Sequence, residues 1–253
     1  MLGLAAGLQK SGASLLTFVK DNLKLYLDFK SNRSDTLAFP SEGSTSFVKS
    51  SSQYISLGDS DSLSFGDSSS DTPFSVTAWV NANDITSFPI LAKGTASVRE
   101  YIFGFSSLDK LSFGCHDNSD ASISINRTGA TALTSFQGSW IHVAGTYDGS
   151  GVNSGIKLYI NGASESTTDG SNGSYTAMHN LGEAVIGRTF SDGTNYADGK
   201  MANVAIWNRV LSPEEVQSVM NKSYSQLGSV EKTSLVMWQS LDSQSNGLVF
   251  FCF

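Results

Sequence analysis

Acid–base or nucleophilic catalysis in this chain would have to draw on three histidines, His116, His142 and His179. None of them stands in a serine- or cysteine-nucleophile signature, so the spacing contains no catalytic triad. His142 falls in an alternating strand pattern, where a ring packs or faces solvent, and His179 falls in a polar, loop-like stretch. We predict that all three histidines are structural residues.

Glycoside hydrolysis is the second chemistry to test, because a retaining glycosidase needs a pair of carboxylates held about 5 Å apart. Such a pair would show as acidic residues at short, regular spacing along one strand. The candidates are instead isolated or lie together on a helix: Glu100, Glu165, Glu183, Glu214, Glu215 and Glu231. The sequence therefore predicts a protein that is not an enzyme.

Oxygen-rich loops could hold calcium, a hard cation that prefers carboxylate and amide oxygens. None of these loops has EF-hand spacing, and Asp and Asn in turns commonly bond to their own backbone. We therefore predict no cofactor and keep calcium only as an alternative. Its candidate ligands are Asp117, Asn118, Asp120, Asp192 and Asp198.

Aromatic side chains could form a platform for sugar rings. Most of them occupy strand-like positions, where packing in the core is the expected role. Tyr175 and Tyr196 lie instead in stretches rich in Gly, Ser and Asn. We predict that these two tyrosines are the ligand-contacting residues.

The composition indicates which elements must position these side chains. The chain of 253 residues is 40% hydrophobic and only 15% charged, with 24 glycines, which suits short strands and frequent turns better than long amphipathic helices. Its 16 Lys and Arg against 23 Asp and Glu give a net charge of −7, with no basic run, so nucleic-acid binding is not expected.

The chain start and the cysteines point to a reducing compartment. The sequence opens on a Gly- and Leu-rich stretch without the positive region of a signal peptide, and no stretch approaches the ~18 apolar residues of a membrane span. We expect neither export by an obvious signal nor membrane insertion. Cys115 and Cys252 lie far apart and outside any CxxC pair, so two free thiols are favoured over a disulfide.

Short alternating segments recur along the chain after an N-terminal arm of residues 1–22. The expected strands are Leu23–Phe29, Thr45–Val48, Tyr54–Leu57, Phe74–Val80, Pro89–Lys93, Tyr101–Phe105, Leu111–Cys115, Ala121–Asn126, Trp140–Tyr147, Ile156–Ile160, Glu183–Gly187 and Lys200–Trp207. Around a dozen short strands without alternating helices predict a two-sheet antiparallel jelly-roll sandwich over residues 23–253.

Two short motifs predict specific elements within this pattern of strands. Asn161-Gly162 is a strong hairpin turn, because both residues tolerate positive φ. Ser212-Pro213-Glu214-Glu215 combines an N-cap serine, a proline at the first helical position and a capping-box glutamate, and predicts one short helix that covers an end of the sandwich. The apolar tail Leu248–Phe253 is expected to be the closing strand.

The ranges Trp140–Gly149 and Lys157–Gly162 resemble the central hairpin of laminin-G-like domains, which belong to the concanavalin-A-like jelly rolls together with the pentraxins. Asp198–Val216 extends the resemblance through a strand, a glycine turn and a Leu-Ser-Pro-Glu-Glu helix start. The resemblance covers residues from about Tyr54 to the C-terminus. It implies a jelly roll that binds sugars, lipids or proteins, often through calcium at a loop rim.

The chain departs from the functional patterns of these families at three points. Ala202 and the pair Thr189 and Phe190 stand where acidic metal ligands are expected in laminin-G-like domains and in pentraxins, respectively. The Glu-x-Asp-x-x-Glu strand of glucanases with this fold does not occur. These departures weigh against an inherited calcium site and against glycosidase activity.

The Gly- and Leu-rich start and the Leu25-Tyr26-Leu27-Asp28 segment also resemble virion proteins of marine bacteriophages. This second resemblance implies a non-catalytic virion structural protein, a capsid decoration or accessory protein assembled in the host bacterial cytoplasm. Its arm would bind other virion proteins in the capsid or tail, its jelly roll would face outward toward surface glycans, and it would form a homo-oligomer. The alternative is a lectin-like glycan- or receptor-binding module, including a tail-fibre or tail-associated component.

Overall fold

The structure is a computed structural model that describes residues 43–179, 181–190 and 193–241. These residues form two antiparallel sheets of seven strands each, so the predicted jelly-roll sandwich is confirmed. The predicted arm (1–22), the boundary at residue 23, the predicted strand Leu23–Phe29 and the predicted closing strand Leu248–Phe253 lie outside the described residues, as do Asp192 and Cys252.

Sheet A contains the long central strands of the sandwich. Its order is β1-β13-β3-β8-β9-β10, and β14 also pairs with β13. The strands are β1 (Thr45–Phe47), β13 (Asp198–Trp207), β3 (Phe74–Asp84), β8 (Ile141–Tyr147), β9 (Ile156–Ile160), β10 (Ala163–Ser164) and β14 (Leu235–Gln239).

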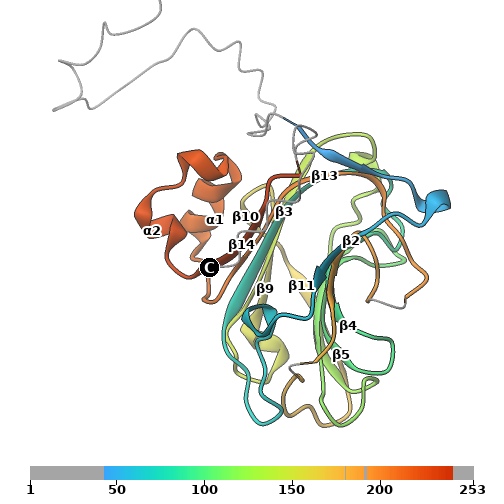
Figure 1. The fold of residues 1–253 in the computed structure, drawn as a ribbon, viewed down its shortest axis with the longest axis vertical. Coiled ribbons are helices and arrows are strands. Elements are labelled where there is room, and N and C mark those ends of the chain that lie inside the picture. The colour runs from blue at the N-terminus through green and yellow to red at the C-terminus, as the bar shows by residue number, and fades with distance from the viewer. Residues whose placement is uncertain (1–42, 180, 191–192, 242–253) are drawn as a thin grey trace, which may run out of the picture. The chain divides into compact units, whose positions relative to one another are not determined.

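Sheet B faces it across the core (Figure 1). Its order is β11-β7-β6-β5-β4-β12-β2. The strands are β11 (Thr167–Asn172), β7 (Ser124–Gly129), β6 (Leu111–His116), β5 (Arg99–Phe105), β4 (Pro89–Gly94), β12 (Ala184–Ile186) and β2 (Ile55–Gly58).

The helices among the described residues are short. They are α1 (Pro213–Met220), α2 (Ser229–Lys232) and the 3₁₀ turns η2 (Lys49–Ser51), η3 (Asp61–Leu63), η4 (Thr134–Phe136), η5 (Asn153–Gly155) and η6 (Tyr224–Gln226). No helix in the described ranges is long and apolar enough to cross a membrane.

The core forms because alternate residues of facing strands point inward. In sheet B the inward row includes Tyr101, Phe103 and Phe113, all fully buried. The ring of Phe74 in β3 contacts the Phe113 ring edge-on, with 5.3 Å between the ring centroids. It also stacks on the Phe65 ring, with 4.2 Å between the centroids. Aromatic rings from both sheets therefore interlock at the centre of the sandwich.

The outward row of sheet A is also buried, although the alternation predicts strands with one wet face. Trp79 and His142 are 1% and 2% exposed. The reason is that α1 and α2 lie on the side of sheet A away from sheet B (Figure 1), so the predicted helix covers a face and not an end of the sandwich. A second apolar cluster fills this layer: Ala144, Tyr159, Ala205, Trp207, Leu211, Val216, Val219, Leu227, Leu235 and Trp238.

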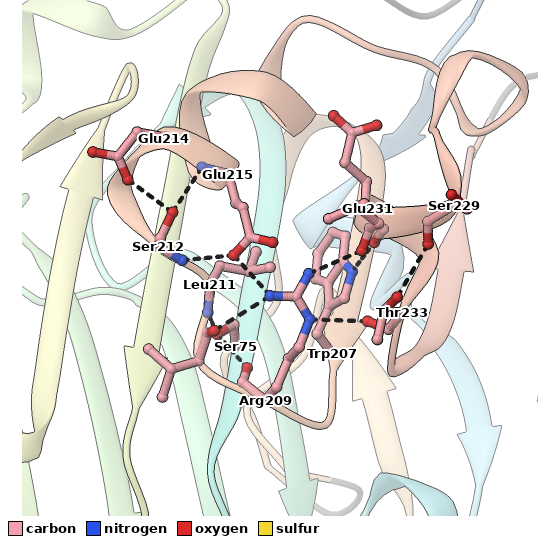
Figure 2. Close-up of polar contacts among 12 residues, drawn as sticks. Ser75, Trp207, Arg209, Leu211, Ser212, Glu214, Glu215, Ser229, Glu231 and Thr233 are labelled. Carbon is pink, nitrogen blue, oxygen red and sulfur yellow. Dashed lines mark hydrogen bonds and ion pairs between the residues drawn. The ribbon is translucent and has the colours of Figure 1, made fainter.

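Polar contacts fix this helical layer to the sheet (Figure 2). The capping box predicted at Ser212 is present: Glu215 N donates to Ser212 Oγ at 3.2 Å, and Ser212 N donates to Glu215 Oε2 at 2.9 Å. Arg209 Nη1 donates to the same Glu215 oxygen at 2.7 Å, and its Nε donates to the carbonyl of Thr233 at 2.9 Å. Trp207 Nε1 donates to the carbonyl of Glu231 at 2.7 Å, which ties α2 to β13.

One predicted strand needs correction, and one strand was not predicted. The strand expected from Ala121 begins at Ser124, because Asp120 folds residues 120–123 into a turn, accepting from Ser122 N at 2.8 Å and Ile123 N at 2.9 Å. The edge strand β11 was missed because its sequence Thr-Thr-Asp-Gly-Ser-Asn has no apolar alternation. Pairing with β7 along its whole length forms this strand.

The predicted turn at Asn161-Gly162 joins β9 to β10. Both residues have positive φ, 50° and 77°. This is the backbone that a two-residue hairpin turn requires, so the prediction is confirmed.

Candidate functional site

A loop folds back over sheet B directly after β12. Gly187 starts it with φ 82°, where a Cβ atom would come within 2.7 Å of the Phe47 ring. Thr189 N donates to the Asn195 carbonyl at 3.0 Å, and Arg188 and Tyr196 form an antiparallel bridge. The two described arms of this loop, residues 188–190 and 193–196, therefore present their side chains beside sheet B.

Tyr196, one of the two predicted ligand-contacting tyrosines, lies in this loop with two partners. The Arg188 guanidinium lies 5.3 Å from the Tyr196 ring centroid and 4.8 Å from that of Tyr54, and the two rings are 6.4 Å apart. Arg188 Nε donates to the Gly193 carbonyl at 2.9 Å, which holds the guanidinium in place. We call Tyr54, Arg188 and Tyr196 the tyrosine–arginine surface.

The chemistry of this surface suits a sugar. Tyr54 directly precedes the edge strand β2 and is 41% exposed, and Tyr196 is half-buried. A tyrosine ring offers an apolar face for stacking, while arginine offers a planar set of N–H donors for hydroxyl or carboxylate oxygens. Cation–π attraction pre-orders the three side chains before any ligand arrives.

A cleft of about 180 Å³ lies on the outer face of sheet B next to this loop. Its lining residues are Ser87, Phe88, Pro89, Ile102, Gly104, Phe105, Ser106, Ser112, Thr189 and Asn195. Gly104 allows β5 to approach β4 closely at this point, because a Cβ atom there would lie 2.6 Å from the Phe88 carbonyl oxygen. The volume is below the roughly 300–1,000 Å³ of sites that enclose a drug-sized ligand, so the cleft fits one small group of a ligand that lies across the surface.

Phe190 anchors the loop to sheet B. It is 4% exposed and packs on Ala92 and Val185. The guanidinium of Arg99 lies 5.3 Å above its ring, and the His116 ring lies 5.8 Å from it. Burial lowers the pKa of His116 to about 4, so this histidine is neutral at pH 7.

Tyr175, the second predicted ligand-contacting tyrosine, lies elsewhere. It is half-buried against the core, and its hydroxyl donates to Asp71 Oδ2 at 2.6 Å. Tyr147 donates to the same oxygen at 2.8 Å, and Met178 N donates to Asp71 Oδ1 at 2.9 Å. Burial raises the pKa of Asp71, and the three donors oppose this shift. Tyr175 thus belongs to a polar network that closes one end of the sandwich.

The described calcium candidates bond mainly to neighbouring protein groups. Asp117 is 1% exposed and accepts from Ser119 N at 2.9 Å, and Asp120 accepts from Ser122 N. Asn118 donates to the Ser68 carbonyl, and Asp198 accepts from an asparagine of β3 at 3.2 Å. Within the ranges that the structure describes, no three or more His, Cys, Asp or Glu side chains form a group that could hold a metal ion.

The residues considered for catalysis do not converge. His142 is buried against Trp79 on the helix-covered face, whereas His116 lies on the opposite outer face, beneath Phe190. Burial lowers the pKa of His142 to about 3. Glu165 accepts from the backbone of Thr131 at 2.8 Å, and the helix glutamates belong to the network of Figure 2.

The sequence interpretation missed Tyr54 and Arg188. Tyr54 falls in the predicted strand Tyr54–Leu57, and Arg188 directly follows the predicted strand Glu183–Gly187. The useful signal was an arginine directly after a strand-ending glycine, because such a residue is poorly placed to pack in the core.

Comparisons with known proteins agree with this architecture. The family model described as "Concanavalin A-like lectin/glucanases superfamily" matches residues 49–217. A search of the curated proteins found no match.

Among solved structures, a candidate carbohydrate-binding protein from Bacteroides ovatus matches with a TM-score of 0.51 and 18% identity, covering 79% of this chain and 52% of that one. The binding domain of Paraclostridial Mosquitocidal Protein 1 matches with a TM-score of 0.50 and 13% identity, covering 72% and 46%. A pentraxin from Limulus polyphemus has a TM-score of 0.44 and 18% identity, covering 66% and 81%. This chain thus spans about half of the first two chains. The family match, which extends over most of the chain, shows that it belongs to the laminin-G-like family of the concanavalin A-like lectin/glucanase superfamily.

Proposed function

We propose that the chain is a non-catalytic structural protein of a bacteriophage virion, a capsid decoration or accessory protein whose jelly roll faces outward and adheres to surface glycans. The N-terminal arm attaches it to other virion proteins, and the tyrosine–arginine surface contacts the glycan.

One observation carries the glycan part of this proposal: the Arg188 guanidinium is held between the rings of Tyr54 and Tyr196. The cleft beside it combines hydroxyl and amide groups with apolar side chains such as Ile102 and Phe105, a mixture that suits one group of a sugar. The carbohydrate-binding role described for the Bacteroides ovatus protein of similar fold supports the same ligand class.

Two observations support the non-catalytic part. The histidines lie apart and have lowered pKa values at His116 and His142, and the glutamates bond to separate structural partners. A retaining glycosidase requires two carboxylates about 5 Å apart at one accessible site. The virion part rests on the Gly- and Leu-rich start and the Leu25–Asp28 segment of the sequence.

A glycan array tests the ligand. Wild-type protein should bind a restricted set of glycans, and Arg188→Gln should weaken that binding by about tenfold, which corresponds to ~1.4 kcal/mol. Lys232→Gln is the matched control, because Lys232 Nζ also lies over a tyrosine ring, Tyr224 at 4.4 Å, but belongs to α2. An equal loss in both variants, or no binding by the wild type, would contradict the proposed site.

Quantitative mass spectrometry of purified particles tests the virion role. A capsid decoration protein should be present in many copies, and deleting residues 1–22 should remove it from the particle. A few copies per particle would favour the tail-associated alternative. Absence from particles, or unchanged incorporation without the arm, would overturn the capsid role or the anchoring role, respectively.

A further inference from the structure

Three ionisable side chains meet at one end of the strands of sheet B, away from the tyrosine–arginine surface. Lys93 is the penultimate residue of β4, Glu100 lies in β5, and Asp59 directly follows β2. Lys93 and Glu100 are both 0% exposed, and both are charged residue types that are rarely buried completely. A fully buried lysine beside two carboxyl groups requires a physical account.

The Lys93 amine is aimed at Asp59. Lys93 Nζ lies 2.9 Å from Asp59 Oδ1 and 3.7 Å from Glu100 Oε2, and it also donates to the Gly182 carbonyl. Gly182 N donates to the other Asp59 oxygen, Oδ2, at 3.2 Å. The Asp59 carboxyl group is therefore held by a backbone N–H on one oxygen while the amine contacts the other.

Glycines make this approach possible. Gly58 has φ 72° and turns the chain from β2 into Asp59. Gly182 has φ 98°, and a Cβ atom there would lie 2.7 Å from the Cα of Gly94, the residue after Lys93. The backbone around the amine and the carboxyl group is thus packed to bring them together and hold them.

Glu100 is positioned as a proton carrier. Its Oε1 accepts from Phe65 N at 3.0 Å, and its Oε2 accepts from Ser64 Oγ at 3.3 Å while facing Lys93. Burial raises the pKa of Glu100 to about 8, with Lys93 opposing the shift, and this direction favours the protonated carboxyl group. The hydrogen bond from Lys93 lowers the pKa of Asp59, which stays ionised.

We propose that Lys93 and Asp59 condense spontaneously into an intramolecular amide bond, with Glu100 relaying the proton. The Lys93 ammonium first passes one proton to the Asp59 carboxylate, which leaves a neutral amine and a neutral acid. The nitrogen lone pair then attacks Asp59 Cγ, and the Gly182 N–H stabilises the negative charge that develops on Oδ2.

The step balances without any other reactant. Glu100 gives its proton to the departing Oδ1 hydroxyl and takes one from the nitrogen, so it ends as it began. The C–O bond breaks, the C–N bond forms, and one water leaves. An ammonium and a carboxylate become a neutral amide, and the net charge of the chain is unchanged. The Asp59 side chain is 51% exposed, which gives the water a path out.

Intact mass of the purified, denatured full-length protein tests this directly. The chain should be lighter than its sequence by one water. A mass equal to the sequence mass would overturn the proposal. This wild-type result needs no variant, so a variant that fails to fold does not affect it.

Tryptic mapping separates the amide from a dehydrated aspartate. Asp59 and Lys93 lie in one segment, because no Lys or Arg occurs between Lys49 and Lys93. With the amide formed, trypsin cannot cut after Lys93, and residues 50–99 should appear as one fragment that has lost water. A dehydrated fragment that ends at Lys93 would show a cyclised aspartate instead and would overturn the proposal.

Variants check the role of each group. Lys93→Arg and Glu100→Gln should restore the full sequence mass, whereas Asp59→Asn should lose ammonia in place of water, still with no cut after Lys93. Lys157→Arg, at an exposed position of β9, is the control and should keep the water loss. Loss of water in folded Lys93→Arg would contradict the assignment.

Discussion

The two outer faces of the sandwich differ in what covers them. On sheet A, even polar outward residues such as Ser75, Thr77 and Thr146 are buried, because α1 and α2 bring a second apolar cluster onto the strands. On sheet B, outward residues such as Ser112 and Thr128 remain half-buried, and among the described residues the loop around Phe190 packs on this face. The comparison teaches that the helical layer buries the outer face of sheet A, whereas the proposed binding surface lies on the less covered outer face of sheet B.

The largest loss of stability is expected from a substitution in the helical layer that covers sheet A. Trp207 is fully buried in the second cluster and donates to the Glu231 carbonyl. Trp207→Ala should lower the free energy of unfolding by about 3–5 kcal/mol, because it leaves a cavity and an unpaired carbonyl. Chemical denaturation measures this effect. A loss below about 1 kcal/mol would show that the helical layer adds little to stability.

The two faces can also be compared through the pH dependence of stability, because His142 lies on the outer face of sheet A and His116 lies on the outer face of sheet B. Both pKa values are lowered, to about 3 and about 4, because burial disfavours the charged ring. The unfolded chain binds protons below about pH 6.5 and the folded chain does not, so stability is fully present above pH 6.5 and falls toward pH 4.

At pH 5, each histidine should reduce the free energy of unfolding by about 2 kcal/mol relative to pH 7, the cost of roughly 1.5 pKa units. His142→Phe should remove about half of this pH-dependent loss of stability, and His116→Phe should remove the other half. The measurement is denaturant unfolding at both pH values. An unchanged pH dependence in folded His142→Phe would contradict the assignment.

A smaller effect is expected at the start of α1. Ser212→Ala removes the oxygen that accepts from Glu215 N and should reduce stability by about 1 kcal/mol. Thermal unfolding measures it, and glycan binding should be unchanged. A binding loss in this variant would show that the covered face is coupled to the ligand.

The smallest effect on stability is expected on the outer face of sheet B. Tyr196→Ala should change the free energy of unfolding by no more than about 0.5 kcal/mol, because the ring is half-buried in a surface loop, yet it should abolish glycan binding. Unfolding and glycan-array measurements on the same preparation check both halves. A variant that unfolds easily, or that binds like the wild type, would remove Tyr196 from the site.

Local signals explain which parts of the fold were predictable. The Asn161-Gly162 turn and the Ser212 capping box are decided within a few residues, and both occur as the sequence predicts. The burial of His142 was not decided locally, because it depends on a helix seventy or so residues further along the chain that returns to cover β8 and β3. The alternation of apolar and polar residues along a strand cannot predict that both faces of its sheet are buried.

The site was predictable only in part for the same reason. A loop rich in Gly and Asn drew attention to Tyr196, but its partner Tyr54 comes from a distant segment and joins it through Arg188. Asp59, which follows β2, likewise reaches Lys93 of β4 and Glu100 of β5 only in the folded sheet. The loop signal that selected Tyr196 also selected Tyr175, whose hydroxyl bonds to Asp71 within the fold.

Hydrogen–deuterium exchange with and without the best-binding glycan tests the division of the two faces most directly. Bound glycan should slow exchange in residues 53–57, 101–105, 188–190 and 193–196, and should leave α1 and α2 unchanged. Slower exchange confined to α1 and α2, with none around Tyr54, Arg188 and Tyr196, would contradict the account.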